Sequence, residues 1–524
     1  MADLALGIAG LVAGVPGLIQ VIALLGDAVL QRLGHYDDDY QSRVKLVARS
    51  SQSQTQDLLL YLEGLDNKAP EALVRDVHDM FQALRNTLER LVPLLPGTGT
   101  DEQATERTKL SAVKKVKIDA EVGNIEEWND RIWKRMMVLK FFGSCKELPS
   151  SSDEHEAVSL RKVERLRDAI QESLDKARSE SNLLLGRPEE ASCRLLPDSS
   201  LQLKISKAGG PPFLVERRIY SDDASEQEIQ QHRKIVCEVA RILRQADPSF
   251  MGLLYCSGFL PEPLECRLEL HFPLPEGLQN PRSLLNLLLD PVNKQAGAKH
   301  PLNHRIALAK SVVVAVLILH LAGFVHKQIR PDNIIILDQV PSTQSNVSAG
   351  DAADPTKLTY PYIISKPFLV GFDNVRKVDA ASLMLPDEEW EKNIYLSPER
   401  QRLQKGDEFN MQHDLYSLGV VLLEIAFWTS FQDKKSSQLG KVIWRNAEQS
   451  ALCGPEKLKG RYMSLAKSSV PRLIGQKYAD VVIACLTGLK SENGGLESLE
   501  DENGIIVGTR YILEIVKKLE EIHL

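Results

Sequence analysis

The sequence has few cysteines and no excess of basic charge. Its seven cysteines stand at positions 145, 193, 237, 256, 266, 453 and 485. Their number is odd and no two form a CxxC pair, so the spacing favours neither a disulfide framework nor a zinc site, and a reducing compartment is expected. The net charge of −7 argues against a nucleic-acid partner, because nucleic-acid binders usually carry a basic excess.

Several common enzyme motifs are also missing. The chain contains no GxxxxGK[ST] phosphate loop, no HExxH zinc motif and no GxSxG nucleophile elbow. What is present is the composition of a soluble globular protein, with 43% apolar and 26% charged residues. At roughly 100–200 residues per domain, the length of 524 residues predicts two or three domains.

The N-terminal 26 residues contain a long uncharged run. The stretch 4–26 has no charged residue, and about 20 apolar residues suffice to span a membrane. Its regularly spaced apolar positions are Leu4, Ile8, Leu11, Val15, Leu18, Ile22 and Leu25. The chain opens Met-Ala-Asp, without the basic start of a secretory signal. Two interpretations stay open: a buried first helix of a bundle, weakened in water by Pro16 and several glycines, or a segment that enters a membrane when it is released.

Helical periodicity continues through the next 150 residues. Apolar residues recur every three or four positions from Leu73 to Val92, and Pro93 ends that helix. Further helices are predicted over 118–142 and 163–174. Because no strand pattern precedes residue 200, we expect an all-α helical bundle over 1–145 and a helical brace or linker over 146–195.

The pattern changes near residue 196. Short strand-like runs, "LQLKIS", "PFLVERRIY", "LLYCSGFL" and "CRLELHFPL", surround one helix at 225–245. A mainly helical region follows from about residue 300. This order predicts an α+β, two-lobed domain over 196–524, with a small lobe at 196–272 and a large lobe at 280–524. The polar stretch 338–357 is expected to be a flexible insertion.

Four motifs in the large lobe resemble those of protein kinases. A long apolar helix runs into "HKQIRPDNIIIL", which is similar to the kinase catalytic loop H-R-D-L-K-P-x-N. "FLVGFDNVR" stands where the D-F-G segment belongs, "YLSPER" resembles A-P-E, and "HDLYSLGVVLLEIAFW" resembles the buried helix that follows. On this alignment the catalytic-loop positions are His326, Gln328, Arg330 and Asn333. The structural positions are Ser397, Pro398, Glu399 and Asp414.

The catalytic groups of a kinase are replaced in this alignment. Gln328 stands at the position of the proton-accepting aspartate, and a neutral amide cannot act as a base. Gly371 stands at the position of the metal-binding aspartate and offers no ligand, while Asp373 lies two residues later. Asn333 alone is a poor site for a hard cation, so no metal is expected. The chain is therefore interpreted as a pseudokinase.

The small lobe lacks the glycine-rich loop that covers the nucleotide in kinases. In "FLVERRIY", Arg218 is the choice for the strand lysine and Arg217 is the alternative. Glu238 is a candidate ion-pair partner for that arginine, against the simpler interpretation of a solvated helix charge. The degenerate nucleotide site then comprises Arg218, Glu238, Asn333, Gly371 and Asp373. It requires no cofactor and allows ATP to bind without turnover.

The first 145 residues resemble the HeLo (prion-inhibition and propagation) domain family of fungal heterokaryon-incompatibility and cell-death proteins. The resemblance rests on the glycine-rich start, on "YDDDYQSRVKLVARS" and on "IEEWNDRIWKRMM". It implies a bundle whose first helix, here Leu4 to Gly26, can be expelled into a membrane. Two basic clusters favour an anionic membrane surface, against the alternative of solvated helix faces. The first is Arg107, Lys109, Lys114, Lys115 and Lys117, and the second is Arg131, Lys134, Arg135 and Lys140.

Together these resemblances imply a signalling protein of the programmed-cell-death type, in which the kinase-like domain regulates a membrane-active bundle. The expected partners are a protein or upstream sensor, an anionic membrane and further copies of the chain on activation, but no nucleic acid. The expected location is the cytoplasm, with relocation to the plasma membrane. Two alternatives stay open: an active or weakly active Ser/Thr kinase that binds ATP, and an adaptor without membrane activity.

Overall fold

The computed structural model divides the chain into two compact units. The N-terminal unit comprises Met1–Val163 and Glu500–Thr509, and the C-terminal unit comprises Glu164–Leu499 and Arg510–Leu524. The residues described are 2–32, 44–45, 47–49, 51–52, 71–95, 112–142, 182–186, 191–207, 210–290, 300–340, 363–377, 390–401, 410–453, 455–489 and 511–522. The predicted helix at 163–174 and most of the brace 146–195 lie outside them.

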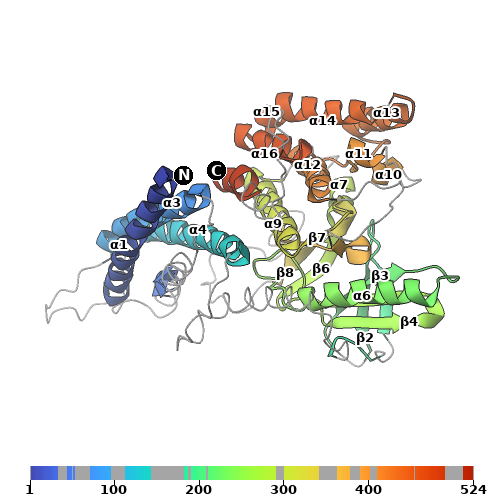
Figure 1. The fold of residues 1–524 in the computed structure, drawn as a ribbon, viewed down its shortest axis with the longest axis horizontal. Coiled ribbons are helices and arrows are strands. Elements are labelled where there is room, and N and C mark those ends of the chain that lie inside the picture. The colour runs from blue at the N-terminus through green and yellow to red at the C-terminus, as the bar shows by residue number, and fades with distance from the viewer. Residues whose placement is uncertain are drawn as a thin grey trace. The chain divides into compact units, whose positions relative to one another are not determined.

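The described part of the N-terminal unit is helical, as the sequence predicts. Its elements are α1 (Ala2–Arg32), α3 (Glu71–Leu91), the short 3-10 turn η2 (Val92–Leu94) and α4 (Ala112–Phe142). Helix α3 packs against both α1 and α4 (Figure 1). Its buried face consists of Val74, Val77, Met80, Phe81, Leu84, Leu88 and Leu91. Pro93 lies in η2, so the predicted helix end is confirmed.

Helix α1 is longer than its composition indicates. It runs without a break through Pro16, although an interior proline costs a helix about 3 kcal/mol. Its C-terminal half is packed against α3, with Leu18 and Ile22 buried and Leu25 half-buried. This packing offsets the proline. Leu4, Ile8, Leu11 and Val15 lie outside the residues whose side chains are described.

The C-terminal unit begins with an antiparallel sheet of order β1-β2-β3-β5-β4. Its strands are β1 (Ala191–Leu195), β2 (Gln202–Ser206), β3 (Phe213–Ile219), β4 (Gly258–Glu262) and β5 (Arg267–Pro273). Helix α6 (Glu226–Leu243) follows β3 and packs on β4 and β5. The sequence patterns identify β2, β3, β5 and α6, but β1 precedes residue 196, where the first strand was expected.

The remainder of the C-terminal unit is mainly helical, with two small sheets of order β6-β8-β9 and β10-β7. The strands are β6 (Leu278–Ser283), β7 (Phe324–Val325), β8 (Ile334–Gln339), β9 (Lys366–Leu369) and β10 (Arg376–Lys377). The helices that matter below are α7 (Leu284–Leu289), α9 (Leu302–Leu321), α11 (Pro398–Gln401), α12 (Met411–Phe427), α14 (Glu456–Ser468), α15 (Val470–Ile474), α16 (Gln476–Leu486) and α18 (Lys517–Glu520).

The structure bears on two further expectations, the flexible insertion at 338–357 and a helix that could cross a membrane. Asp338 and Gln339 end β8 instead of starting a flexible insertion, because the buried Asp338 pairs with Arg282 on β6 at 2.5 Å; positions 341–357 lie outside the described residues. Within the described residues, α9 is the one helix long and apolar enough to cross a membrane, and 72% of its apolar window is buried inside the protein. That burial fits a core helix.

Candidate functional site

A buried carboxylate, Asp414, holds the loop that contains the kinase-like motif. Asp414 lies in the first turn of α12 and is fully buried. It accepts hydrogen bonds from the backbone N–H of His326 at 2.6 Å and of Lys327 at 2.8 Å, and it lies 3.1 Å from His320 Nε2. Lys327 has a φ of +70°, which is unfavourable for a side-chain-bearing residue. The Asp414 bonds therefore hold a strained turn in place.

His326 joins this loop to the segment after β9. Its Nδ1 accepts a hydrogen bond from the Gln328 N–H at 3.3 Å, so its Nε2 donates to the Val370 carbonyl at 2.8 Å. The His326 ring meets the Phe372 ring edge-on, with centroids 5.4 Å apart. Burial lowers the pKa of His326 to about 4. The imidazole is therefore a neutral structural link.

The position of the missing base is occupied by an amide pair. Asn333 Nδ2 donates to the Gln328 carbonyl at 2.9 Å and lies 3.3 Å from Gln328 Oε1. Arg330 donates two hydrogen bonds to Asp332, from Nε to Oδ1 at 3.2 Å and from Nη2 to Oδ2 at 3.0 Å. Asp332 is thus already bound by a cation, and the loop presents neutral amides where a kinase presents a carboxylate.

Gly371 has no room for the metal-binding side chain of a kinase. Its φ is +87°, a region that favours glycine. A Cβ placed there would lie 2.4 Å from Asn333 Cγ, well inside van der Waals contact. An aspartate at this position would need both a backbone change and displacement of Asn333.

The sequence patterns missed Glu216, which is central to this region. Glu216 lies in the middle of β3, is 2% exposed, and its Oε2 accepts a hydrogen bond from the Gly371 N–H at 2.9 Å. Burial, with Asp373 nearby, raises the pKa of Glu216 to about 8, although the N–H groups of residues 371–373 oppose this shift. Strand alternation places residues 216 and 218 on one face, but it does not indicate which of them reaches Gly371.

The two arginines of β3 point to different places. Arg218, on the same face as Glu216, donates from Nε to His232 Nδ1 on α6 at 2.8 Å. Arg217 lies on the opposite face, where its Nε is 3.2 Å from Glu269, so it does not face Gly371. Glu238 is buried on α6, and its pairing with Arg218 stays a prediction.

The tip of the β1–β2 hairpin is bound to the start of α7. Ser283 Oγ donates to the Pro197 carbonyl at 3.1 Å, and Asn286 Nδ2 donates to Asp198 Oδ2 at 2.8 Å. In kinases a glycine-rich loop lies between the first two strands; here that turn reads "LPDSSL". These bonds connect the five-stranded sheet to the helical lobe.

The segment resembling A-P-E packs on α12 and α14. Ser397 is buried immediately before α11, Pro398 starts that helix, and the Glu399 carboxylate lies 4.0 Å from Lys459 Nζ. Ser417 Oγ on α12 donates to the Tyr395 carbonyl at 2.8 Å. The predicted structural positions therefore lie in the helical lobe, around the start of α12.

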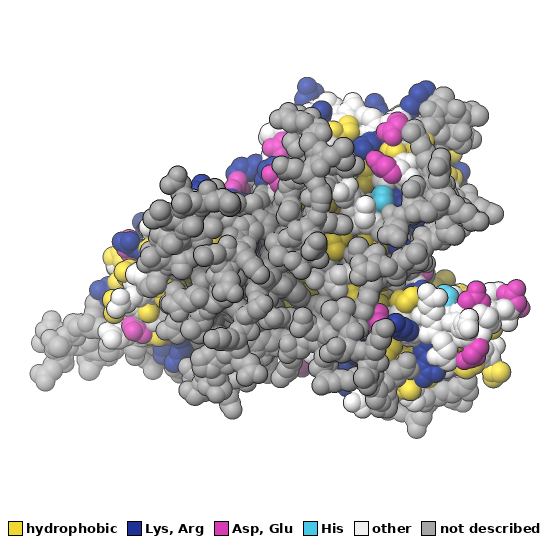
Figure 2. Space-filling model, viewed as in Figure 1, with side chains coloured by type: hydrophobic (Ala, Val, Ile, Leu, Met, Phe, Trp, Pro, Cys, Tyr) yellow, Lys and Arg dark blue, Asp and Glu magenta, His cyan; other side chains and the backbone are white. Residues whose placement is uncertain are grey.

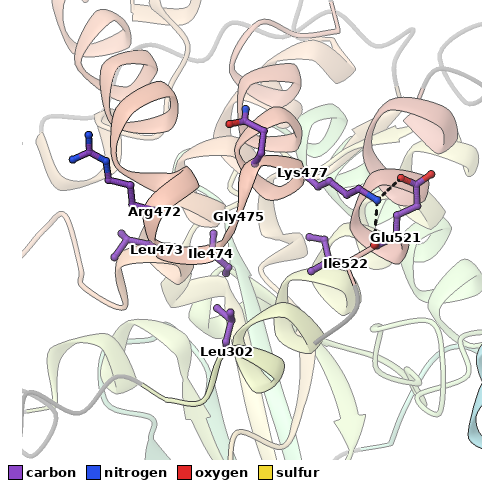
Figure 3. A pocket seen from close by; sticks show the side chains of 9 residues that line it. Leu302, Arg472, Leu473, Ile474, Gly475, Lys477, Glu521 and Ile522 are labelled. Atoms are coloured by element: carbon purple, nitrogen blue, oxygen red, sulfur yellow. Dashed lines mark hydrogen bonds and ion pairs between the residues drawn. The ribbon is translucent and has the colours of Figure 1, made fainter. Parts of the chain in front are cut away.

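The helical lobe also contains a cavity of about 460 Å³, away from the loop 326–333 (Figure 3). It is lined by Leu302, Arg472, Leu473, Ile474, Gly475, Gln476, Lys477, Glu521 and Ile522. Its central cation, Lys477, is 2.9 Å from Glu521 and forms an ion pair with it. None of the predicted site residues lines this cavity.

Three of the four residues of the second basic cluster, Arg131, Lys134 and Arg135, are buried, and the side chain of Lys140 lies outside those described. Arg135 and Asp76 form a buried ion pair at 2.9 Å between α4 and α3, while Arg131 pairs with Glu127 and Lys134 with Asp130 along α4. These cations are neutralised because acidic residues lie one helical turn away or on the facing helix. In the first cluster, Lys114, Lys115 and Lys117 are exposed beside Val113 and Val116, and Arg107 and Lys109 lie outside the described residues.

Comparison with protein-family models and with curated proteins finds no match for this chain. Among the described residues, no group of three or more His, Cys, Asp or Glu side chains is arranged to hold a metal ion.

Replacing Asp414 by alanine should destabilise the C-terminal unit. The change leaves the N–H groups of His326 and Lys327 buried without an acceptor, so we expect a loss of about 3 kcal/mol in the free energy of unfolding, measured by urea denaturation. Asp480→Ala on α16, which removes a half-exposed carboxylate, is the control and should change stability by about 0.5 kcal/mol or less. Equal effects of the two substitutions would contradict the anchoring role.

Stability should fall as pH rises from 6.5 to 8. Burial raises the pKa of Glu216 and of Glu424, a buried residue of α12, to about 8. In this pH range the folded state therefore binds protons that the unfolded state has lost, and the free energy of unfolding falls as pH rises. Glu216→Gln should remove one such group, flattening the slope by about 1 kcal/mol per pH unit.

Urea denaturation at pH 6.5 and 8 measures this slope. Measurements below pH 6.5 are less informative. Burial lowers the pKa of His326 and His300 to about 4, so these two groups make the free energy of unfolding rise with pH in that range. Glu89→Gln, on the surface of α3, serves as the control. A slope in Glu216→Gln equal to that of the unsubstituted chain would contradict the assignment.

Proposed function

We propose that residues 196–524 form a protein-kinase-like domain that binds and regulates without transferring phosphoryl groups. The order of elements supports this: a five-stranded antiparallel sheet with one helix between β3 and β4, followed by a helical lobe. The contact of Asp414 with the backbone of residues 326 and 327 gives the motif-bearing loop a fixed place beside Gly371. Three of the four motifs thus meet at this loop, whereas the segment around Ser397 packs on α12 and α14.

The observation that carries the proposal is the crowding at Gly371. Phosphoryl transfer requires a carboxylate that holds magnesium, and at this position a Cβ alone would overlap Asn333. The neighbouring carboxyl, Glu216, binds the Gly371 N–H from the opposite lobe, and its raised pKa favours the uncharged form at neutral pH. Gln328 is neutral at every pH. The region therefore supports a fixed contact between lobes better than it supports catalysis.

An active kinase remains the rival. Asp373 is half-buried near Glu216, whose own pKa is raised in part by that charge. Asp332 is held by both nitrogens of the Arg330 fork. Asp332 is thus engaged by Arg330, which favours the regulatory interpretation, and Asp373 is the acidic residue on which an active kinase would depend.

The N-terminal unit is the proposed effector, through release of α1 onto an anionic membrane. The 23 uncharged residues 4–26 would span about 34 Å as a helix, enough for a bilayer core of about 30 Å. At rest α1 is retained by Leu18, Ile19, Ile22 and Val29, which are buried. It is also held by the bonds from Gln52 to the Ala23 carbonyl at 2.7 Å and from Arg32 to the Val92 carbonyl at 2.7 Å.

The surface supports reversible contact with lipid better than firm attachment. On the face shown in Figure 2, basic, acidic and apolar side chains are interspersed over the described atoms. The exposed start of α4, with Lys114, Lys115 and Lys117, contributes about 1 kcal/mol per basic residue at an anionic surface. Assembly of several copies would add to this attraction. In this proposal the chain resides in the cytoplasm and reaches the plasma membrane after a partner protein acts on the kinase-like domain.

The first test is nucleotide binding by the full chain. We expect no transfer of labelled phosphate to a generic substrate, and a thermal shift with ATP that is the same in magnesium and in EDTA, because no carboxylate holds the metal. Binding at 100 times Kd stabilises a fold by about 2.7 kcal/mol, which is easily detected. Transfer that needs magnesium and disappears in Asp373→Ala would establish the active kinase instead.

The second test is leakage from dye-loaded anionic liposomes. Arg32→Ala removes one hydrogen bond that retains α1, and Gln52→Ala removes two, to the Ala23 carbonyl and to Asp27 Oδ1. A loss of about 1 kcal/mol should raise the released fraction, and hence the leakage rate, about fivefold. Arg85→Ala removes an ion pair within α3 alone and should leave leakage unchanged. If the folded variants cause no leakage, the chain is an adaptor without membrane activity.

A further inference from the structure

A second, smaller cavity in the helical lobe has features that no part of the proposed function uses. Its volume is about 150 Å³. It is lined by Ser397, Glu399, Asn410, Gln412, His413, Tyr416, Lys459, Leu486, Thr487 and Gly488. These residues come from α11, the start of α12, α14 and the end of α16. The cavity is therefore enclosed by elements of one lobe.

Two buried hydroxyl groups line this cavity without a hydrogen-bond partner among the described residues. They are Ser397 Oγ and Tyr416 OH, on side chains that are 4% and 2% exposed. Leaving such groups unpaired is unfavourable, and buried polar groups are nearly always satisfied. Three other buried tyrosines of the same lobe follow that rule. The hydroxyls of Tyr462, Tyr478 and Tyr511 donate to the carbonyls of Ile394, Leu422 and Val313 at 3.1, 2.9 and 3.0 Å.

The other groups around the cavity are mainly donors. Burial raises the pKa of the Tyr416 hydroxyl, which stays protonated and able to donate. His413 Nδ1 accepts the Asn410 N–H at 3.0 Å, so a neutral His413 carries its proton on Nε2. Lys459 contributes a cation. The N-terminus of the 17-residue helix α12 also lies at this cavity, and the positive end of a helix attracts anions.

Two acidic groups oppose this arrangement, because, besides burial, the charges of Glu399 and Glu456 both contribute to the raised pKa of Tyr416. Glu399 lies 4.0 Å from Lys459 Nζ and its side chain is 54% exposed. An anion in the cavity would compete with Glu399 for Lys459. The direction of the change in anion affinity can therefore be tested: neutralising Glu399 should raise the affinity, and neutralising Lys459 should lower it.

We propose that this cavity binds a small tetrahedral oxyanion, namely phosphate. Two buried hydroxyl donors, one lysine and a helix N-terminus are the groups that recognise phosphate oxygens. The volume corresponds to about five water molecules at roughly 30 Å³ each, which suits a single phosphoryl group and not a nucleotide. The source is either free inorganic phosphate or the phosphoryl group of a phosphorylated peptide. The site is independent of the region around Gly371.

Isothermal titration of the full chain with sodium phosphate, against sodium chloride at equal ionic strength, tests the proposal. A phosphoserine pentapeptide and its unphosphorylated form make up the second arm. We expect Tyr416→Phe and Lys459→Gln each to weaken phosphate binding about tenfold, and Glu399→Gln to strengthen it. Binding of inorganic phosphate alone assigns the free ion, while binding of only the phosphopeptide assigns the peptide.

A matched tyrosine variant separates binding from folding. Tyr462→Phe removes a hydroxyl that already has an acceptor, so it should lower the unfolding temperature and leave phosphate affinity within about twofold. Tyr416→Phe, measured without phosphate, should unfold at the same temperature or higher, since it removes an unpaired buried hydroxyl. The proposal is overturned if neither probe binds, or if Tyr416→Phe and Lys459→Gln bind phosphate as the unsubstituted chain does. The two hydroxyls would then be satisfied by ordered water only.

Discussion

The geometry of the C-terminal unit depends on one buried carboxylate. Asp414 lies in the first turn of α12, most of whose residues are buried, and accepts hydrogen bonds from the N–H groups of two consecutive residues in the loop after α9. Because a buried carboxylate requires donors and a strained turn requires acceptors, each stabilises the other. The loop then positions His326 against Val370, and this contact brings the segment 370–372 beside Asn333. Without Asp414, neither Gly371 nor Glu216 would have its present partner.

Gly371 illustrates how the packing of this loop differs from the kinase site that the motifs resemble. A kinase needs the side chain of an aspartate at this position, whereas here a left-handed glycine allows the Asn333 amide to fill the same space. Asn333 in turn binds the Gln328 carbonyl, and the Gly371 N–H is taken by Glu216. An aspartate at position 371 would meet Asn333, and removing Asn333 would take away the donor that binds the Gln328 carbonyl. In the interpretation proposed above, the absence of an aspartate at position 371 is therefore tied to how the loop is packed.

The sequence predicted the regular elements well and the local chemistry in part. Helix α3 has strong apolar periodicity that survives in the structure, because burial of one face decides its position. Strands β3 and β5 were recognised from their strand-like runs, although the centres of both are buried on both faces. Strand β1 has only five residues, four of them exposed, and so has little periodicity to read. Glu216 was missed for another reason: its partner is a backbone N–H 155 positions away, which no residue type reveals. The cluster at 131–135 appeared basic because charges were counted along the chain, whereas Asp76 comes from a different helix.

The proposed regulatory role requires two states of the C-terminal unit that differ in free energy, and the contacts between its sheet and its helical lobe indicate where they can differ. Moving an equilibrium from 1:99 to 99:1 takes about 5.5 kcal/mol of differential binding. The residues up to 272 are joined to the helical lobe by the bond from Gly371 to Glu216, by two bonds between the β1–β2 turn and α7, and by the bond from the Leu369 N–H to the Gly252 carbonyl at 2.9 Å. Net hydrogen bonds contribute about 1 kcal/mol each, so breaking these four costs an amount that one well-placed partner could supply. Glu216 adds a further control, because its carboxyl is close to losing its proton at neutral pH and a charged carboxylate there would have to be solvated or paired. The N–H groups of residues 371–373 favour the ionised form of Glu216, so a partner would separate this carboxylate from Gly371 only by offering it a competing donor or cation.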